Sequence, residues 1–319
     1  MGKKREIIWI FLLLMIILIP GVLAGFSDWF KKVTGQASTE GPVDFNISVG
    51  TGNAPTITQV WNWSGAVTLN DGPSNTNLTI NFSVTDADTA SNLKDSSATI
   101  NVSKSGVGRI NNSACTKYES SGNFANYTCN VTMWWWDSDG VWTINISIQD
   151  TQGNKAINDT TNITINMVTG FVSGPGNLTF GTLEPGTTNQ TPTNWITLNN
   201  TGNQDVGTHN VQFNATDLKG ETTDTQGLWA TNFSVGPTTG AAKPECDSGG
   251  STSTNMTNGT SGDSFEPIYD SVLIAGNFSI NNNVTGQETL YVCIQKLGLG
   301  LSQQSYSTLA EGAWTIKVV

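Results

Sequence analysis

Asn77-Leu78-Thr79-Ile80-Asn81-Phe82-Ser83-Val84 alternates strictly between polar and apolar side chains. Successive side chains of a β-strand point to opposite faces, so the four apolar residues are expected to face a core. The Asn, Thr and Ser side chains then face water. The segment therefore predicts a half-buried strand whose outer face is polar but carries no charge.

Similar alternation recurs along the chain in short runs that are separated by Gly, Asn, Asp and Pro turns. The runs are Thr99–Ser103, Asn126–Met133, Trp142–Gln149, Asn162–Met167, Trp195–Asn199, Asn210–Ala215, Phe278–Ile280, Leu290–Gln295 and Trp314–Val319. Many short strands at this spacing are typical of β-sandwiches. We expect an all-β protein with two immunoglobulin-like sandwiches in tandem, at 55–168 and 177–319. A glycine-rich linker is expected at 169–176, and a long Ser/Thr/Gly-rich loop at 237–267.

A family resemblance supports the first sandwich. An acidic, glycine-containing turn at 137–140 leads to Trp142, which opens an alternating strand that ends in Asp150-Thr151-Gln152-Gly153-Asn154. This segment resembles the penultimate-strand region of PKD-type and cadherin-like immunoglobulin-like modules in archaeal and bacterial surface proteins. Val84-Thr85-Asp86-Ala87-Asp88 is similar to an early-strand end of the same modules. The resemblance implies a sandwich fold and leaves the function open.

The second sandwich carries a weaker resemblance. Leu178 to Gly186 suggests a strand and a Pro-Gly turn, and Ile196 to Asn203 suggests a strand followed by Asn-Thr-Gly-Asn. This opening hairpin resembles immunoglobulin-like surface domains and TasA/camelysin-like secreted proteins. Peptidase activity does not follow from it, because His209 is the only histidine and no metal-binding histidine cluster exists.

The N-terminus has the pattern of an export signal. Lys3, Lys4 and Arg5 precede an apolar run, and Val22-Leu23-Ala24 offers small residues for a signal peptidase. We expect residues 1–24 to be a signal peptide and the rest of the chain to lie outside the cell. A retained membrane anchor is the alternative, since the run is nearly long enough to span a bilayer.

Residues 25–54 combine an amphipathic segment with a linker. Phe26, Trp29, Phe30 and Val33 follow helical spacing and form one apolar stripe. The stripe fits a helix that rests on a membrane or on a partner subunit. A short helix docked on its own domain explains it equally well.

Twenty of the 34 asparagines stand in Asn-x-Ser/Thr triplets, called sequons below, where about eight would be expected by chance. The triplets predict N-glycosylation outside the cytosol. The alternative is a strand surface rich in Asn and Thr, because positions i and i+2 share a strand face. The sequon asparagines are Asn46, Asn62, Asn77, Asn81, Asn101, Asn111, Asn126, Asn130, Asn145, Asn158, Asn162, Asn177, Asn189, Asn199, Asn214, Asn232, Asn255, Asn258, Asn277 and Asn283.

The four cysteines fall into two groups. In an oxidising compartment an even number predicts disulfides, and four cysteines allow three pairings. The grouping favours Cys115 with Cys129 and Cys246 with Cys293, one bridge in each expected domain.

The tryptophan triplet Trp134, Trp135 and Trp136 is the most unusual local feature. Strand alternation would place Trp134 and Trp136 on one face and Trp135 on the other. Exposed indoles stack on sugar rings, so the triplet could form a glycan-binding platform. Filling and closing the sandwich core is the alternative role.

Five aspartates lie at expected strand ends and turns: Asp86, Asp88, Asp137, Asp139 and Asp150. Closely spaced carboxylates can supply oxygen ligands to Ca²⁺. Ordinary turn chemistry explains the same residues, because Asp bonds its own backbone in turns. Calcium is the only cofactor that the sequence suggests.

Composition and motifs indicate a binding or structural role. The net charge of −11 argues against nucleic acid as a partner, and no catalytic motif points to an enzyme. We expect a structural or adhesive surface protein whose partners are the cell envelope or other surface proteins. The alternatives are a carbohydrate-binding module and a self-assembling subunit of an extracellular filament or surface layer.

Overall fold

The computed structural model describes residues 52–61, 65–247, 252–259, 264–280 and 285–319. These residues form β-strands and four single-turn 3₁₀ helices, and none of them lies in an α-helix. No helix in this part of the chain is long and apolar enough to cross a membrane. The expected signal or anchor at 1–24 and the amphipathic stripe at 26–33 lie outside the described residues.

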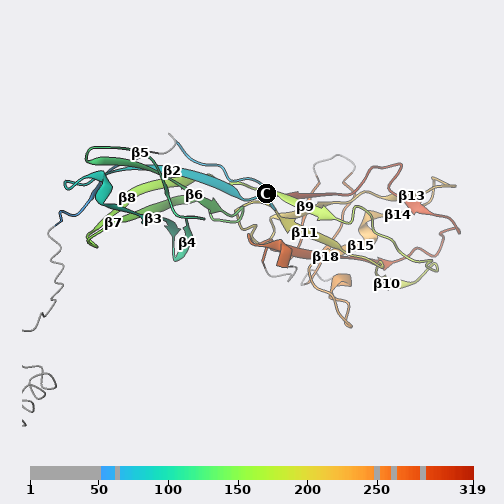
Figure 1. Cartoon of the computed structure of the whole chain (residues 1–319). Helices are drawn as coiled ribbons and strands as arrows, with labels where there is room; N and C mark the ends of the chain where they lie inside the picture. The colour runs from blue at the N-terminus through green and yellow to red at the C-terminus, as the bar shows by residue number, and fades with distance from the viewer. Residues whose placement is uncertain (1–51, 62–64, 248–251, 260–263, 281–284) are drawn as a thin grey trace, which may run out of the picture. The chain divides into compact units, whose positions relative to one another are not determined.

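Two four-stranded antiparallel sheets form what we call the N-terminal sheet pair. The first sheet has the order β1-β2-β6-β5 and the second β4-β3-β7-β8. Figure 1 shows β2 and β6 side by side, as their continuous ten-residue register requires. The strands are β1 (Thr56–Trp61), β2 (Thr76–Thr85), β3 (Leu93–Lys104), β4 (Val107–Ile110), β5 (Thr116–Ser121), β6 (Phe124–Met133), β7 (Gly140–Asp150) and β8 (Lys155–Ile165).

One hydrophobic core joins these two sheets. Ile80, Phe82 and Val84 of β2 are fully buried, as their alternation predicts. Phe82 stacks on Tyr127 of β6 with ring centroids 5.2 Å apart. From the second sheet, Trp142 is fully buried and donates a 2.8 Å hydrogen bond from Nε1 to the Ser138 carbonyl. Burial of each large apolar side chain contributes roughly 1.5–3 kcal/mol to the stability of such a core.

Shorter strands form the C-terminal region, which we define as residues 171–319. Its main sheet has the order β16-β15-β18-β11-β9, and β10 also pairs with β18. Two three-stranded sheets, β17-β12-β20 and β14-β13-β19, complete it. The strands are β9 (Phe171–Gly174), β10 (Thr188–Gln190), β11 (Ile196–Asn200), β12 (Val211–Asn214), β13 (Leu218–Gly220), β14 (Gly227–Leu228), β15 (Phe233–Gly236), β16 (Thr254–Asn255), β17 (Glu266–Pro267), β18 (Gln287–Lys296), β19 (Tyr306–Ser307) and β20 (Thr315–Val318).

A second, separate hydrophobic cluster lies within the C-terminal region. Phe213 and Phe233 each meet the Trp314 ring edge-on, at 5.7 and 5.0 Å between centroids. Trp314 Nε1 donates a 2.7 Å hydrogen bond to the Thr216 carbonyl. Aromatic pairs in this edge-to-face arrangement are among the favoured geometries of core packing.

The structure corrects one expected strand. Phe278–Ile280 is the 3₁₀ helix η4. Ile280 N donates to the Asn277 carbonyl, and Ser279 N donates to Asn277 Oδ1. A local Asn turn therefore satisfies the backbone in place of a sheet ladder. The other alternating runs lie in or overlap strands.

The entry to the C-terminal region also differs from the sequence prediction. Phe171–Gly174, within the expected linker, is β9 and pairs with β11. The residues from 178 to 184 form no strand, although Leu178, Phe180 and Leu183 pack against the second core. Their alternation reflects this packing, while the expected turn at Pro185-Gly186 is present.

Candidate functional site

The outer face of β2 and β6 is built from sequons that pair across the two strands. Asn77 lies opposite Thr132, and Thr79 lies opposite Asn130. Thr79 Oγ1 donates to Asn130 Oδ1 at 2.9 Å, and Thr132 Oγ1 donates to Asn77 Oδ1 at 2.8 Å. Each sequon hydroxyl thus binds the asparagine of the other sequon.

A second pair of sequons follows along the same strands. Asn81 lies opposite Thr128, and Ser83 lies opposite Asn126. Ser83 Oγ donates to Asn126 Oδ1 at 2.5 Å, and Asn126 Nδ2 donates to Glu119 Oε2 at 2.8 Å. Asn126 is only 8% exposed. This pair extends the ladder through Ser83 and the buried Asn126, which also binds the Glu119 carboxylate, while the buried Asn81 Oδ1 has no partner among the described residues.

The other sheet carries the same chemistry on its outer face. Asn101 of β3 lies opposite Asn145 of β7, and the hydroxyls of Thr99 and Ser147 lie 3.0 Å apart. Uncharged polar side chains therefore bond across strands on the outer faces of both sheets, although the buried Asn101 Oδ1 has no partner among the described residues. Cross-strand pairs of this kind stabilise antiparallel sheets by roughly 0.2–1 kcal/mol each.

The sequon asparagines differ widely in exposure. Asn46, Asn62 and Asn283 lie outside the described residues. Asn126 and Asn214 are buried. Those that are exposed are Asn77, Asn130, Asn162, Asn177, Asn189, Asn255 and Asn258. Those that are half-buried are Asn81, Asn101, Asn111, Asn145, Asn158, Asn199, Asn232 and Asn277.

The tryptophan triplet lies in a turn that follows β6. Asp137 N donates to the Trp134 carbonyl at 2.9 Å, which closes the turn. Trp134 is 39% exposed, whereas Trp135 is 5% exposed and packs on Trp136 and Phe278. Trp134 also meets Trp136 edge-on at 4.5 Å. Of the triplet, only Trp134 therefore presents a large part of its ring to solvent.

A buried ion pair supports this turn. Arg109 of β4 donates to both carboxylate oxygens of Asp137, and Nε lies 2.9 Å from Oδ2. Trp134 N donates to the same Oδ2 at 2.8 Å. The Arg109 guanidinium also lies 4.5 Å from the Trp134 ring centroid, in a cation–π contact. The sequence alone does not reveal the role of Arg109, because 28 residues separate it from Asp137 and no local pattern marks it.

The five aspartates of the expected calcium site have other partners. Asp137 binds Arg109, and Asp139 Oδ1 accepts a 2.7 Å hydrogen bond from Gln204. Asp88 accepts two bonds from Asn53, and Asp150 accepts two from Asn154.

Asp86 Oδ1 binds Asp88 N, while the buried Oδ2 has no partner among the described residues. In that part of the chain, no group of three or more His, Cys, Asp or Glu side chains could hold a metal ion. Calcium binding at these aspartates therefore stays a prediction. Asp86, Asp88 and Asp150 stabilise turns, as Asp commonly does. Burial disfavours the charged form of Asp150, but hydrogen bonds from Asn154, Gly153 and Gln152 lower its pKa overall.

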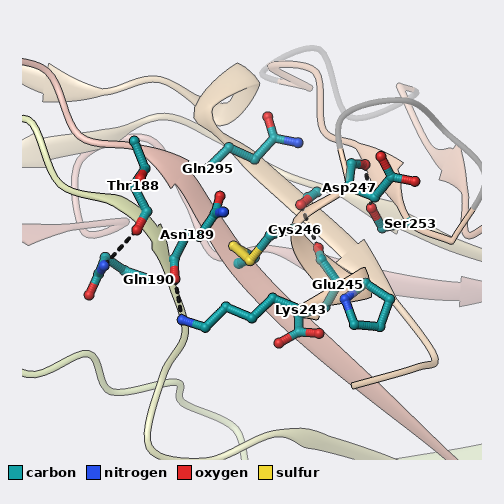
Figure 2. Close-up of a disulfide and its surroundings, with 12 residues drawn as sticks. Thr188, Asn189, Gln190, Lys243, Glu245, Cys246, Asp247, Ser253 and Gln295 are labelled. Carbon is teal, nitrogen blue, oxygen red and sulfur yellow. Dashed lines mark hydrogen bonds between the residues drawn. A yellow bond between two sulfur atoms is a disulfide. The ribbon is translucent and has the colours of Figure 1, made fainter. Parts of the chain in front are cut away.

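Both expected disulfides are present. Cys115 and Cys129 join within the N-terminal sheet pair, with 4.4 Å between Cα atoms. Cys246 and Cys293 join the 3₁₀ helix η3 (Pro244–Cys246) to β18, with 5.2 Å between Cα atoms. Figure 2 shows this second bridge with Lys243 Nζ bonded to the Asn189 carbonyl and Ser253 Oγ bonded to the Asp247 carbonyl.

Acidic groups gather along β18. Burial raises the pKa of Glu288 to about 7, with a further contribution from Asp270, while the backbone amides of Thr289 and Val272 act in the opposite direction. Burial also raises the pKa of Tyr291, to which Glu288 and Glu245 contribute as negative neighbours. The charged form of Glu288 is therefore disfavoured in the folded chain near neutral pH.

The comparisons with known proteins add no family. No family model matches the chain, and no curated protein is significantly similar to it.

Proposed function

We propose that this chain is an exported, N-glycosylated protein of the cell surface with a structural or adhesive role. Its two cores would belong to two immunoglobulin-like sandwiches in tandem, which act as stiff spacers and interaction surfaces. We propose no catalytic role, because no catalytic motif in the sequence points to an enzyme. Its partners would be the cell envelope and other surface proteins.

The pairing of sequons across β2 and β6 is the observation that carries the proposal. The exposed face of a sheet needs polar side chains, and charged residues would fulfil that need as well. Here the face uses Asn with Thr or Ser, in the triplets that an oligosaccharyltransferase accepts. The two disulfides support an oxidising compartment independently of the sequons.

Purification of the native protein from the cell surface tests the proposal. The intact mass should exceed that of the bare polypeptide, and the excess should disappear after chemical deglycosylation. Non-reducing peptide mapping should recover the Cys115–Cys129 and Cys246–Cys293 peptides. A protein found in the cytosol with free thiols and the mass of the bare chain would overturn the proposal.

Carbohydrate binding through Trp134 is the second candidate function. Its exposed ring is backed by Arg109 and Trp136, which hold it in place as a sugar-stacking surface would require. On a glycan array, Trp134→Ala should abolish binding. The control Trp195→Ala changes a more exposed indole beside Tyr291 and should leave binding intact. Loss of binding in both variants, or in neither, would contradict a site at Trp134.

A further inference from the structure

The asparagines of the sequons make two kinds of hydrogen bond. In Asn77 and Asn130, the side-chain oxygen accepts a bond, and the amide nitrogen donates none to the described residues. In Asn111, Asn126, Asn214 and Asn258, the amide nitrogen itself donates. The difference matters because a sugar is attached to the nitrogen and not to the oxygen.

We propose that the fold divides the sequons into glycan acceptors and structural asparagines. The acceptors are Asn77, Asn130, Asn162, Asn177 and Asn189, and the structural set is Asn111, Asn126, Asn214 and Asn258. This inference rests on the proposed function, since it assumes that the chain meets a glycosyltransferase.

The transfer step sets the requirement for an acceptor. Nδ2 attacks the anomeric carbon of a phosphate-activated oligosaccharide, and a C–N bond forms as the C–O bond to the phosphate breaks. The phosphate leaves with the bonding electrons, and one Nδ2 proton passes to a base of the transferase. An acceptor therefore needs an accessible nitrogen with space for a sugar ring beside it.

In the structural asparagines, Nδ2 is buried or engaged in a hydrogen bond, so space for a sugar ring beside it is lacking. Asn126 is 8% exposed, and its Nδ2 binds Glu119. Asn214 is 6% exposed and packs directly on Gly259, where even a Cβ atom would lie 2.1 Å from Asn214 Oδ1. A sugar on either nitrogen would have to displace part of the core or of the backbone.

Asn258 and Asn111 are held by their partners. Asn258 Nδ2 donates at 2.6 Å to Oδ2 of the buried Asp217, whose Oδ1 accepts from Ala230 N at 2.7 Å. Glycosylation would leave Nδ2 with a single N–H, so a sugar at Asn258 would have to fit beside Asp217 Oδ2 while that N–H keeps this bond. Asn111 Nδ2 donates to the Ser113 carbonyl, and its Oδ1 accepts from Ile100 N. Asn258 lies in a loop, so its sequence position alone suggests an accessible acceptor.

The acceptor set meets the requirement. All five side chains are exposed, and none of their hydrogen bonds within the described residues uses the amide nitrogen. A glycosylated asparagine keeps Oδ1, so the ladder bonds of Asn77 and Asn130 persist after sugar attachment. The backbone carbonyls of Asn189 and Asn177 accept hydrogen bonds from Lys243 and Asn194, respectively. Figure 2 shows the Lys243 bond to Asn189.

Site-resolved occupancy of the native surface protein tests the division. Peptide mapping with electron-transfer fragmentation should find glycans on the acceptor set and bare asparagines at the four structural positions. Glycans on Asn126 or Asn214 in folded protein would overturn this inference and leave the proposed function standing. A native protein without any glycan would overturn the proposed function and the inference together.

Paired variants give a second readout. Thr128→Val removes the triplet of Asn126 but keeps the Asn126 amide. The mass of attached glycan and the melting temperature should therefore both stay unchanged. Asn126→Val leaves Glu119 and Ser83 without their partner and should lower the melting temperature by roughly 5 °C. Thr179→Ala should instead remove one glycan from Asn177 at an unchanged melting temperature. A loss of glycan mass in Thr128→Val, or no loss in Thr179→Ala, would contradict the assignment.

Discussion

The N-terminal sheet pair and the C-terminal region keep their folds by different means. Strands β2, β3, β6, β7 and β8 have 10 to 12 residues each, whereas in the C-terminal region only β18, with 10 residues, is longer than five. Among the described residues, four polar or charged side chains are buried in the sheet pair and twelve in the C-terminal region. Regular alternation and apolar burial thus stabilise the N-terminal sheet pair, whereas buried hydrogen bonds are more important in the C-terminal region.

Asn200 illustrates the second mode. It is almost fully buried, and its Nδ2 donates to the carbonyls of Gln204 and Leu273 at 2.7 and 3.1 Å. Its Oδ1 accepts from Gly202 N at 2.9 Å. One side chain thereby binds three backbone groups, of which the Leu273 carbonyl also accepts from Val206 N in a β-bridge. Irregular segments can be buried only if their backbone groups find such partners.

Removal of the central indole of the sheet pair should have the largest effect. Trp142→Ala opens a cavity between the sheets and frees the Ser138 carbonyl, so we expect a loss of about 4–5 kcal/mol in unfolding free energy. Urea denaturation measures it. The control Trp134→Ala removes an exposed indole and should cost less than about 1 kcal/mol. Equal losses in the two variants would contradict apolar burial as the main stabilising contribution.

The disulfides should differ between the regions. Replacement of Cys246 and Cys293 by alanine opens a loop of 47 residues and should cost about 4 kcal/mol by the chain-entropy model. The same change at Cys115 and Cys129, which are 14 residues apart, should cost about 3 kcal/mol. Denaturant midpoints of the two double variants give the comparison. A larger loss for the Cys115–Cys129 pair would reverse the expected order.

Asn200→Ala tests the buried hydrogen bonds of the C-terminal region. The Gly202 amide and the Gln204 carbonyl lose this partner, while the Leu273 carbonyl keeps its bond from Val206 N, so we expect a loss of about 2 kcal/mol. Asn112→Ala, an exposed control whose amide donates to Thr132 Oγ1, should stay within about 0.5 kcal/mol of the wild type. If the two variants unfold alike in urea, the C-terminal region does not depend on buried polar groups as we infer.

The smallest expected effect is a dependence on pH. The folded-state pKa of Glu288 is about 7, above its ordinary value of 4.5, so the folded chain binds more protons than the unfolded chain between these values. The stability that this group contributes is therefore present below pH 4.5 and is lost as the pH rises to 7. Since the side chain is partly exposed, we expect a change of about 1 kcal/mol. Unfolding at pH 5 and at pH 8 should show it in the wild type and not in Glu288→Gln. If the unfolding free energy of Glu288→Gln changes between pH 5 and pH 8 as much as that of the wild type, another group causes the effect.

The comparison also explains what the sequence could predict. The alternation of Leu78, Ile80, Phe82 and Val84 continues over a whole strand, so local pattern and tertiary burial agree. The disulfide pairing followed from grouping, because each partner lies in the same region of the chain. In the C-terminal region, by contrast, Phe278–Ile280 is too short for its period to separate a strand from a 3₁₀ turn.

The candidate site was less predictable, because contacts between residues that are distant in the sequence decide which of its side chains are exposed. Strand alternation gave Trp134 and Trp135 opposite faces but could not say which is exposed, because the chain leaves β6 at Met133. Arg109 reaches Asp137 only through tertiary structure. Likewise, Asn126 and Asn130 belong to identical triplet types, and only the neighbours of each side chain distinguish the buried one from the exposed one.

The ladder of β2 and β6 has a consequence for the media in which the chain can remain folded. Its bonds join neutral groups, as in Thr79–Asn130 and Thr132–Asn77, and dissolved ions screen charges rather than such short dipolar contacts. The described residues contain three ion pairs, of which Arg109–Asp137 is the least accessible to solvent. A change in salt concentration should therefore weaken these cross-strand hydrogen bonds only slightly. We expect the cross-strand bonds of β2 and β6 to depend little on ionic strength.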